Sequence, residues 1–128
     1  MAILPIYASL LTILFVYLSI KTIRTRRSLG IGLGHAENPA MLRAMRVHAN
    51  FAEYVPIALV LIFLVESSSA HAWFVHCLGG ALVTARASHA FGVSRTPENF
   101  RFRIFGMVLT FTVLLVCAIY LLAVALTK

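Results

Sequence analysis

The sequence is short of charge. Only 12% of its 128 residues are charged, and just four are acidic. Hydrophobic residues account for 61%, and the mean hydropathy is +0.94. A soluble domain of this size could not bury so much apolar surface. The composition therefore excludes a soluble globular domain and indicates an integral membrane protein, whose apolar helices cross the bilayer in runs of about 20 residues.

Cysteine is also scarce, and a cleavable signal is missing. Cys77 and Cys117 lie in separate apolar runs, without the close spacing of paired metal ligands. We expect two packed free thiols and no metal site. The N-terminus lacks the basic region and the small-residue cleavage site of a signal peptide, so we expect a retained first membrane span.

The net charge is +7, and ten of the eleven lysine and arginine residues lie in two parts of the chain. The polar turn at residues 66–71 has no lysine or arginine. Because basic loops stay in the cytoplasm, we expect both blocks to be cytoplasmic and both termini to lie on the other side of the membrane. The basic residues are then expected to set the membrane topology, to bind lipid phosphates and to contribute to a binding site. No nucleic acid is expected as a partner. The blocks are Lys21, Arg24, Arg26, Arg27, Arg43 and Arg46, and Arg86, Arg95, Arg101 and Arg103.

The apolar runs predict an all-α, four-transmembrane-helix up-down bundle forming a single domain over residues 1–128. The expected spans are 2–23, 39–66, 70–91 and 99–127. Asn38-Pro39 is typical of a helix N-cap followed by proline at the first helical position. Thr96-Pro97-Glu98 suggests a similar start for the last helix, and Gly92 suggests the end of the third. A flexible loop with several glycines is expected from Arg26 onward.

The second predicted helix carries a polar stripe where it enters the membrane. Arg43, Arg46, Asn50 and Glu53 fall within an arc of roughly 80° at about 100° per residue. Polar and charged groups at membrane depth are costly unless they are paired or functional, so the stripe predicts a site. Pro56 follows the stripe and is expected to bend the helix.

Other helices bring polar residues to the same depth. Arg86 and His89 are three apart and share one face of the third helix. Arg101 and Arg103 point about 160° apart, so only one of them should face the same cavity. Clustered arginines favour an anion, whereas Glu53 favours a cation. The residues therefore suggest a small zwitterion with extra carboxylates that meets a lipophilic molecule at the membrane interface.

The string Arg43-x-x-Arg46-x-His48-x-Asn50-x-x-Glu53-Tyr54-x-Pro56 resembles the second-helix signature of the MAPEG family, the membrane-associated proteins in eicosanoid and glutathione metabolism. The segments Ala85–Gly92 and Arg101–Met107 fit the family's order of parts, so the likeness covers the whole chain. It is strongest to small bacterial members of unassigned substrate that are similar to microsomal glutathione transferases, and it therefore implies a bacterial inner membrane. The resemblance implies a homotrimer that binds glutathione, as cosubstrate, between subunits at the cytoplasmic face.

Carried over by position, the resemblance implies that Arg46, Asn50, Glu53 and Tyr54 contact glutathione. Asn50 and Glu53 would hold the γ-glutamyl ammonium, and the arginines would bind carboxylates, bidentately where the geometry allows. The other residues placed at the site are Arg43 on the stripe, Arg86 and His89 on the third helix, His48 facing an adjacent site, and Arg26 or Arg24 reaching across from a neighbouring subunit.

For catalysis the resemblance points to an arginine at the start of the fourth helix: Arg103 first, Arg101 second. A free thiol titrates near pH 8.5, so a nearby guanidinium would raise the thiolate fraction at neutral pH. The thiolate would attack a lipophilic electrophile or a lipid hydroperoxide. Val93 and Ile104 replace a tyrosine and a serine found in some relatives. These changes argue against prostaglandin or leukotriene chemistry and favour a general transferase or peroxidase.

Three other interpretations compete with this one. The polar stripe could be only an internal network that holds the bundle and trimer together. The chain could be a non-catalytic family member that binds lipid or serves as a scaffold. It could also be a small multidrug exporter, but such a protein needs a membrane carboxylate that exchanges protons. The arginines around Glu53 would keep it ionised, which disfavours the exporter.

Overall fold

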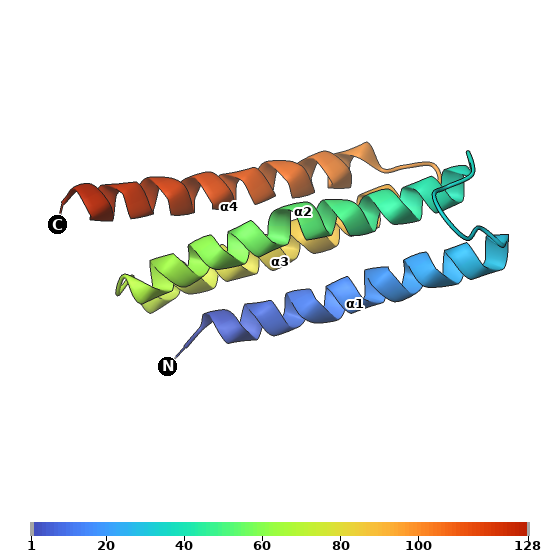
Figure 1. Ribbon diagram of the computed structural model, residues 1–128. Coiled ribbons are helices and arrows are strands. Elements are labelled where there is room, and N and C mark those ends of the chain that lie inside the picture. Colours follow the sequence, from blue (N-terminus) through green and yellow to red (C-terminus); the bar gives the residue numbers. More distant parts are fainter. Residues whose placement is uncertain (1, 128) are drawn as a thin grey trace.

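The computed structural model describes residues 2–127 and contains four helices: α1 (Leu4–Leu29), α2 (Pro39–Ser67), α3 (Ala72–Ser94) and α4 (Phe100–Leu126). No strand occurs in this part of the chain. The helices run alternately up and down, with both termini at one end and the α1–α2 and α3–α4 connections at the other (Figure 1). The predicted all-helical up-down bundle is confirmed.

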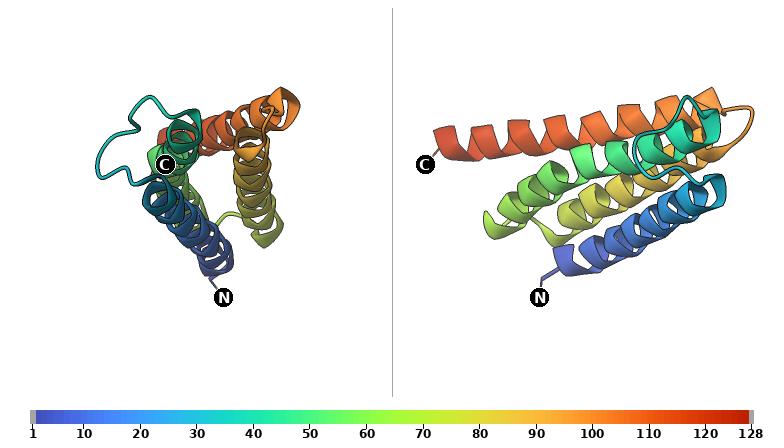
Figure 2. Two further views of the ribbon diagram at one scale, coloured as in Figure 1. Left: turned by 90° about the vertical axis from the view of Figure 1, so that its right-hand side faces the viewer. Right: turned by 45° about the vertical axis from the view of Figure 1, so that its right-hand side comes forward.

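The two central helices, α2 and α3, separate the outer pair. α1 packs on α2 and α3, and α4 packs on α3 and α2, whereas α1 and α4 do not contact each other within the described residues. In Figure 1 and in the right-hand view of Figure 2, α2 and α4 lie closer together near the loops than at their other ends. The loop end of the bundle is therefore where residues of α2, α3 and α4 can meet.

Three of the helices, α1, α2 and α4, are long and apolar enough to cross a membrane. α3 does not meet the same threshold within residues 2–127, because its 23 residues include Arg86 and several other polar side chains, at 76, 84, 88, 89 and 94. It nonetheless lies along the bundle, and Arg86 and His89 are only 1% and 4% exposed. Neighbouring helices thus cover these two side chains from lipid, as intramembrane polar groups require.

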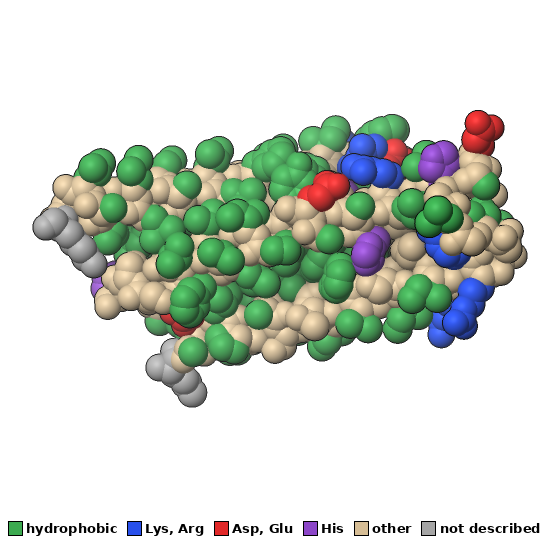
Figure 3. Space-filling view, viewed as in Figure 1, with side chains coloured by type: hydrophobic (Ala, Val, Ile, Leu, Met, Phe, Trp, Pro, Cys, Tyr) green, Lys and Arg blue, Asp and Glu red, His purple; other side chains and the backbone are tan. Residues whose placement is uncertain are grey.

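The outer surface is largely apolar along the bundle (Figure 3). Large exposed hydrophobic side chains include Ile13 on α1, Phe63 on α2 and Ile119 on α4. Charged side chains on the face shown gather mainly toward the loop end (Figure 3). This distribution fits a bundle whose sides contact lipid and whose loop end lies at an interface.

Helix α1 is longer than its predicted span. It continues to Leu29 and ends at Gly30, whose φ of 65° is the left-handed conformation that glycine adopts easily. The expectation that a loop starts at Arg26 is therefore wrong. No residue before Gly30 breaks the helix, and Arg26 and Arg27 in the last turn interact favourably with the helix dipole.

The limits of α2 and α4 agree with the predicted spans to within one residue, whereas α3 begins and ends later than predicted. The Asn38 side chain accepts hydrogen bonds from the backbone N–H groups of Ala40 and Met41, which confirms the predicted N-cap. At α4 the cap is Asn99, whose side chain accepts from the N–H of Phe102, so the predicted cap at Thr96 is wrong. α2 runs through Pro56 as one helix.

Gly92 does not end α3, which continues to Ser94. A Cβ on Gly92 would lie 2.6 Å from the backbone nitrogen of Arg103, so the absence of a side chain lets the start of α4 approach α3. Gly106 serves the same purpose one turn further on, where a Cβ would lie 2.5 Å from the carbonyl oxygen of Ala85. These two close approaches fix the position of Arg103 relative to His89.

Candidate functional site

A cavity of about 280 Å³ opens at the loop end, between α2, α3 and α4. Small-molecule sites generally start at about 300 Å³, so the space suits a compact ligand or part of a larger one. Three arginines from two helices face it. The lining residues are Pro39, Leu42, Arg43, Arg46 and Asn50 of α2, His89 and Val93 of α3, Glu98 of the α3–α4 connection, and Arg103 of α4.

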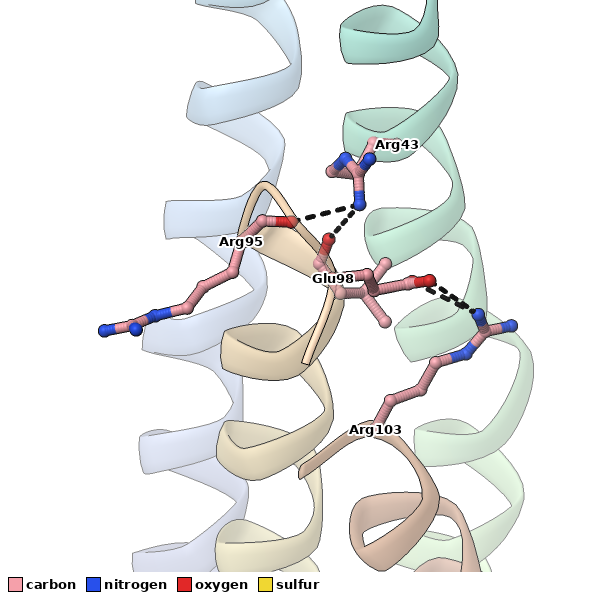
Figure 4. A network of polar contacts seen from close by, with 5 residues as sticks. Arg43, Arg95, Glu98 and Arg103 are labelled. Carbon is pink, nitrogen blue, oxygen red and sulfur yellow. Dashed lines mark hydrogen bonds and ion pairs between the residues drawn. The ribbon is translucent and has the colours of Figure 1, made fainter. Parts of the chain in front are cut away.

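Two arginines organise the rim of the cavity (Figure 4). Arg43 donates through Nη1 to the carbonyl oxygens of Val93 and Arg95, at 3.1 Å each. Arg103 donates through Nη1 to both carboxylate oxygens of Glu98, again at 3.1 Å. The α3–α4 connection is thereby tied to α2 on one side and to α4 on the other. The side chain of Arg95 points away from this network (Figure 4) and lies over the Phe91 ring.

The inner end of the cavity rests on the buried Arg86. Its Nη2 lies 2.6 Å from Asn50 Oδ1 and 3.4 Å from His89 Nδ1. Its Nη1 lies 3.4 Å from Thr110 Oγ1, and its carbon Cζ lies 5.7 Å from the centre of the Phe51 ring. Arg86 itself does not line the cavity. It joins α2, α3 and α4 directly beneath it.

The predicted stripe is only partly assembled in one chain. Arg43, Arg46 and Asn50 line the cavity, but Glu53 does not. Arg46 Nη1 and Glu53 Oε1 are 3.9 Å apart, and the two side chains are 60% and 50% exposed. A pair so exposed contributes about 0–1 kcal/mol, so it does not explain why charged groups stand at this depth. Tyr54 also lies outside the cavity, where its ring packs edge-on against Phe111 of α4.

The two candidate catalytic arginines are separated, as their spacing predicts. Arg103 lines the cavity, whereas Arg101 is exposed beside Phe102 and Phe105 on another part of the surface. The structure thus brings the first-choice residue, and not the second, together with Arg46, Asn50 and His89.

The remaining predicted site residues make contacts of other kinds. His48 faces α1, where Nε2 is 3.0 Å from Ser19 Oγ and the ring stacks on Phe15. Arg26 donates to the carbonyl oxygens of Ile31 and Gly34 and so holds the loop of its own chain. Arg24 is exposed and makes no side-chain hydrogen bond within residues 2–127. None of the three lines the cavity.

The sequence reasoning missed two features of this site. It treated Glu98 as part of a helix cap, whereas Glu98 pairs with Arg103 at the rim. It also treated Arg43 only as a ligand contact, whereas this side chain fixes the α3–α4 connection. Glu98 precedes α4 and is five residues from Arg103, so helical periodicity gave no signal for this pair; the only signal was an acidic residue next to the basic start of α4.

The cavity is chemically suited to an anion. Arg43, Arg46 and Arg103 line it, and guanidinium groups bind carboxylates in a fixed fork. Glu98 is the one carboxylate among the lining residues, and Arg103 already binds it. No group of three or more metal-ligating side chains that could hold a metal ion is found in residues 2–127.

Known proteins resemble this chain along almost its whole length. A model of the MAPEG family matches residues 4–123. Two curated relatives, both named "Inner membrane protein YecN", come from Escherichia coli strain K12 and from an Escherichia coli O6:H1 strain. Each is 32% identical over 120 residues, which cover 94% of this chain and 86% of the relative. No solved structure matches the chain significantly.

Proposed function

The chain belongs to the MAPEG family, and from this membership and the arginine-lined cavity we propose that it is a membrane-bound glutathione transferase. It would join the sulfur of glutathione to lipophilic electrophiles at the cytoplasmic face of the membrane, with lipid hydroperoxides as a further class of substrate. The observation that carries the proposal is the meeting of Arg43, Arg46 and Arg103 around a cavity that Asn50 and His89 close at its inner end.

In this proposal the three arginines have two roles, binding of the carboxylates and stabilisation of the thiolate. Arg43 and Arg46, which stand nearer the loop end of α2, bind the carboxylates of glutathione. Arg103 lies beside the sulfur and stabilises the thiolate. Each pKa unit by which the bound thiol is depressed corresponds to about 1.4 kcal/mol of preferential binding of the thiolate. For Arg103 to do this, its guanidinium must share or release Glu98, which binds it at 3.1 Å.

Once the thiolate has formed, the remaining requirement is that the electrophile reaches it. The thiolate attacks an electrophilic carbon, a carbon–sulfur bond forms, and the leaving group departs with its electron pair. The lipophilic partner has an apolar approach at the mouth of the cavity. Leu42 of α2 lines the cavity and is 41% exposed. A substrate dissolved in the membrane would meet the cavity from this side.

The proposed assembly is a homotrimer. A half-exposed pair such as Arg46 and Glu53 is poorly placed against lipid, and a neighbouring subunit would cover it. Glu53, Tyr54 and the exposed Arg24 then belong to a site completed between subunits. In this assembly Arg24, whose side chain makes no hydrogen bond inside the described chain, reaches across more readily than Arg26, which holds its own loop.

The test is conjugation of glutathione to 1-chloro-2,4-dinitrobenzene by the purified protein in detergent. We expect turnover that Arg103→Ala lowers at least tenfold, which corresponds to the loss of about one pKa unit of thiolate stabilisation. Arg101→Ala is the matched control, because it removes an equal charge two residues away and should leave turnover within twofold. Turnover of cumene hydroperoxide, measured in parallel, decides whether the peroxidase activity is present.

Absence of both activities and of glutathione binding would contradict the transferase. The non-catalytic family member that binds lipid or serves as a scaffold would then be the better account.

A further inference from the structure

The buried Arg86 contacts both side chains that close the cavity at its inner end. One nitrogen, Nη2, approaches Asn50 Oδ1 at 2.6 Å and His89 Nδ1 at 3.4 Å. Arg86 and His89 are 1% and 4% exposed, so these contacts are shielded from water. A guanidinium has five N–H donors and no acceptor. Whatever faces it must therefore be an acceptor, and this condition fixes the orientation of both partners.

For Asn50 the condition determines which end of the amide faces the ligand. Its oxygen is engaged by Arg86, so the side-chain NH₂ group is left for the cavity that Asn50 lines. No acceptor contacts this NH₂ group within residues 2–127, since the contact with Arg86 is the side chain's only hydrogen bond there. Asn50 thus presents two N–H donors, and no free carbonyl, to a bound molecule.

For His89 the condition selects a tautomer. Nδ1 faces the guanidinium and so must offer its lone pair, which places the ring proton on Nε2. His89 lines the cavity although the residue is only 4% exposed. Its Nε2 has no hydrogen-bond partner in the described chain. A second N–H donor is therefore left without a protein acceptor beside Asn50.

The other charged groups around the cavity do not change this character. Arg43, Arg46 and Arg103 add only donors. The single carboxylate, Glu98, comes from the α3–α4 connection and is bound by Arg103. The inner end of the cavity therefore has donors on two sides, Asn50 and His89, and the positive charge of Arg86 behind them.

We propose that Arg86 is a positioning residue that holds Asn50 and His89 as hydrogen-bond donors, so that the inner end of the cavity binds an anionic atom of the ligand. This replaces the expectation that Asn50 helps to hold an ammonium group, which would need an acceptor. The anionic atom is either the thiolate or a carboxylate. Its identification with a group of glutathione rests on the proposed function.

The deciding experiment is Asn50→Asp, which keeps the shape of the side chain and exchanges its donors for acceptors. Glutathione and its analogue with a methyl group in place of the thiol are titrated against the full-length protein in detergent by calorimetry. We expect Asn50→Asp to weaken glutathione binding at least tenfold, the usual scale for one hydrogen bond to a charged group. Equal or tighter binding would overturn the proposal, because an acceptor at residue 50 would then serve the ligand.

The two ligands separate the two possible anions. If Asn50→Asp weakens glutathione but not the thiol-free analogue, the donors hold the thiolate. If both ligands are weakened equally, they hold a carboxylate. Either result supports the donor assignment.

A second pair of variants tests His89 without relying on Asn50. His89→Gln retains an N–H donor near the position of Nε2 and should bind glutathione within about threefold of the unaltered protein, whereas His89→Leu should lose at least tenfold. Equal affinities for the two variants would overturn the role of His89. Combining Asn50→Asp with Arg86→Gln should give less than the sum of the two separate losses, since Arg86 acts through Asn50.

The tautomer of His89 can be measured with no ligand present, by nitrogen-15 NMR of the labelled protein. A proton on Nε2 is expected, and a proton on Nδ1 would overturn the proposal even if the chain bound glutathione. If the unaltered protein bound neither glutathione nor its analogue while the Nε2 proton was found, only the proposed function would fail.

Discussion

Arg103 binds both carboxylate oxygens of Glu98, at 3.1 Å each, across the rim of the arginine-lined cavity. The carboxylate of Glu98 thus already binds the Arg103 guanidinium that the proposed reaction requires. The two side chains are 46% and 18% exposed, so water screens the pair in part and its strength is modest. A ligand anion can compete for Arg103 at small cost, and removal of Glu98 should favour the ligand.

Glu98→Gln is therefore expected to tighten glutathione binding by about two- to fivefold, which corresponds to the usual 0–1 kcal/mol of an exposed ion pair. Calorimetric titration in detergent measures the effect. Glu37→Gln, in the exposed first loop, is the control of equal charge change and should have no effect. Weaker binding by Glu98→Gln would mean that the carboxylate holds the ligand or positions Arg103 for it.

The close approach of α3 and α4 predicts a strong effect at Gly106. A methyl group there would lie 2.5 Å from the carbonyl oxygen of Ala85 and 2.7 Å from His89 Cβ. Gly106→Ala should destabilise the protein by about 1–3 kcal/mol, the usual cost of overpacking, and should displace Arg103 from His89. The thermal unfolding midpoint and the glutathione affinity should both fall.

Gly32→Ala is the matched control for this substitution, because a Cβ on Gly32 meets nothing within 4 Å. Its unfolding midpoint should stay within about one degree of the unaltered protein. If Gly106→Ala unfolded at the same temperature as Gly32→Ala, the account of the α3–α4 contact would be wrong.

Arg43 is predicted to stabilise the α3–α4 connection as well as to bind ligand. Its Nη1 donates to two carbonyl oxygens, those of Val93 and Arg95. Each of these hydrogen bonds stabilises the connection by about 0.5–1.5 kcal/mol, or more because the donor is charged. In Arg43→Met the connection should open more often, and trypsin should cleave after Arg95 several times faster. Arg24→Met removes an exposed arginine without such contacts and should leave the rate unchanged.

The orientation in the membrane is a further prediction. If both basic loops are cytoplasmic, the C-terminus lies on the other side, and a C-terminal alkaline phosphatase fusion should be active in a bacterial host. A fluorescent protein that matures only in the cytoplasm should stay dark at the same position. The opposite pair of results would place the proposed site outside the cytoplasm, where it would need a different source of glutathione.

Much of the fold could be predicted because it depends on local signals. Apolar runs gave four helices, and the amide of Asn38 marked the start of α2 correctly. The limits of α3 were wrong because Gly92 was interpreted through its conformational freedom alone. Its role here is the absence of a side chain where Arg103 approaches, which depends on how two helices pack and not on either helix by itself.

The candidate site likewise combines features that local sequence signals predict with features that depend on how the helices pack. Helical periodicity correctly placed Arg43, Arg46 and Asn50 together and separated Arg101 from Arg103. It could not show that Arg86 lies beneath Asn50, because that contact joins residues 36 apart in the chain. Glu53 was grouped with the stripe by the same periodicity, and Tyr54 was added by the family resemblance, yet both lie outside the cavity of a single chain. Their role depends on the proposed trimer.

The most direct test of the central claim is a glutathione titration of the purified protein, followed by the ultraviolet difference absorbance of the thiolate. The account predicts saturable binding with a thiolate band at neutral pH, and it predicts that Arg103→Ala abolishes the band while glutathione still binds through Arg43 and Arg46. No saturable binding, or a thiolate band of full intensity in Arg103→Ala, would contradict the account.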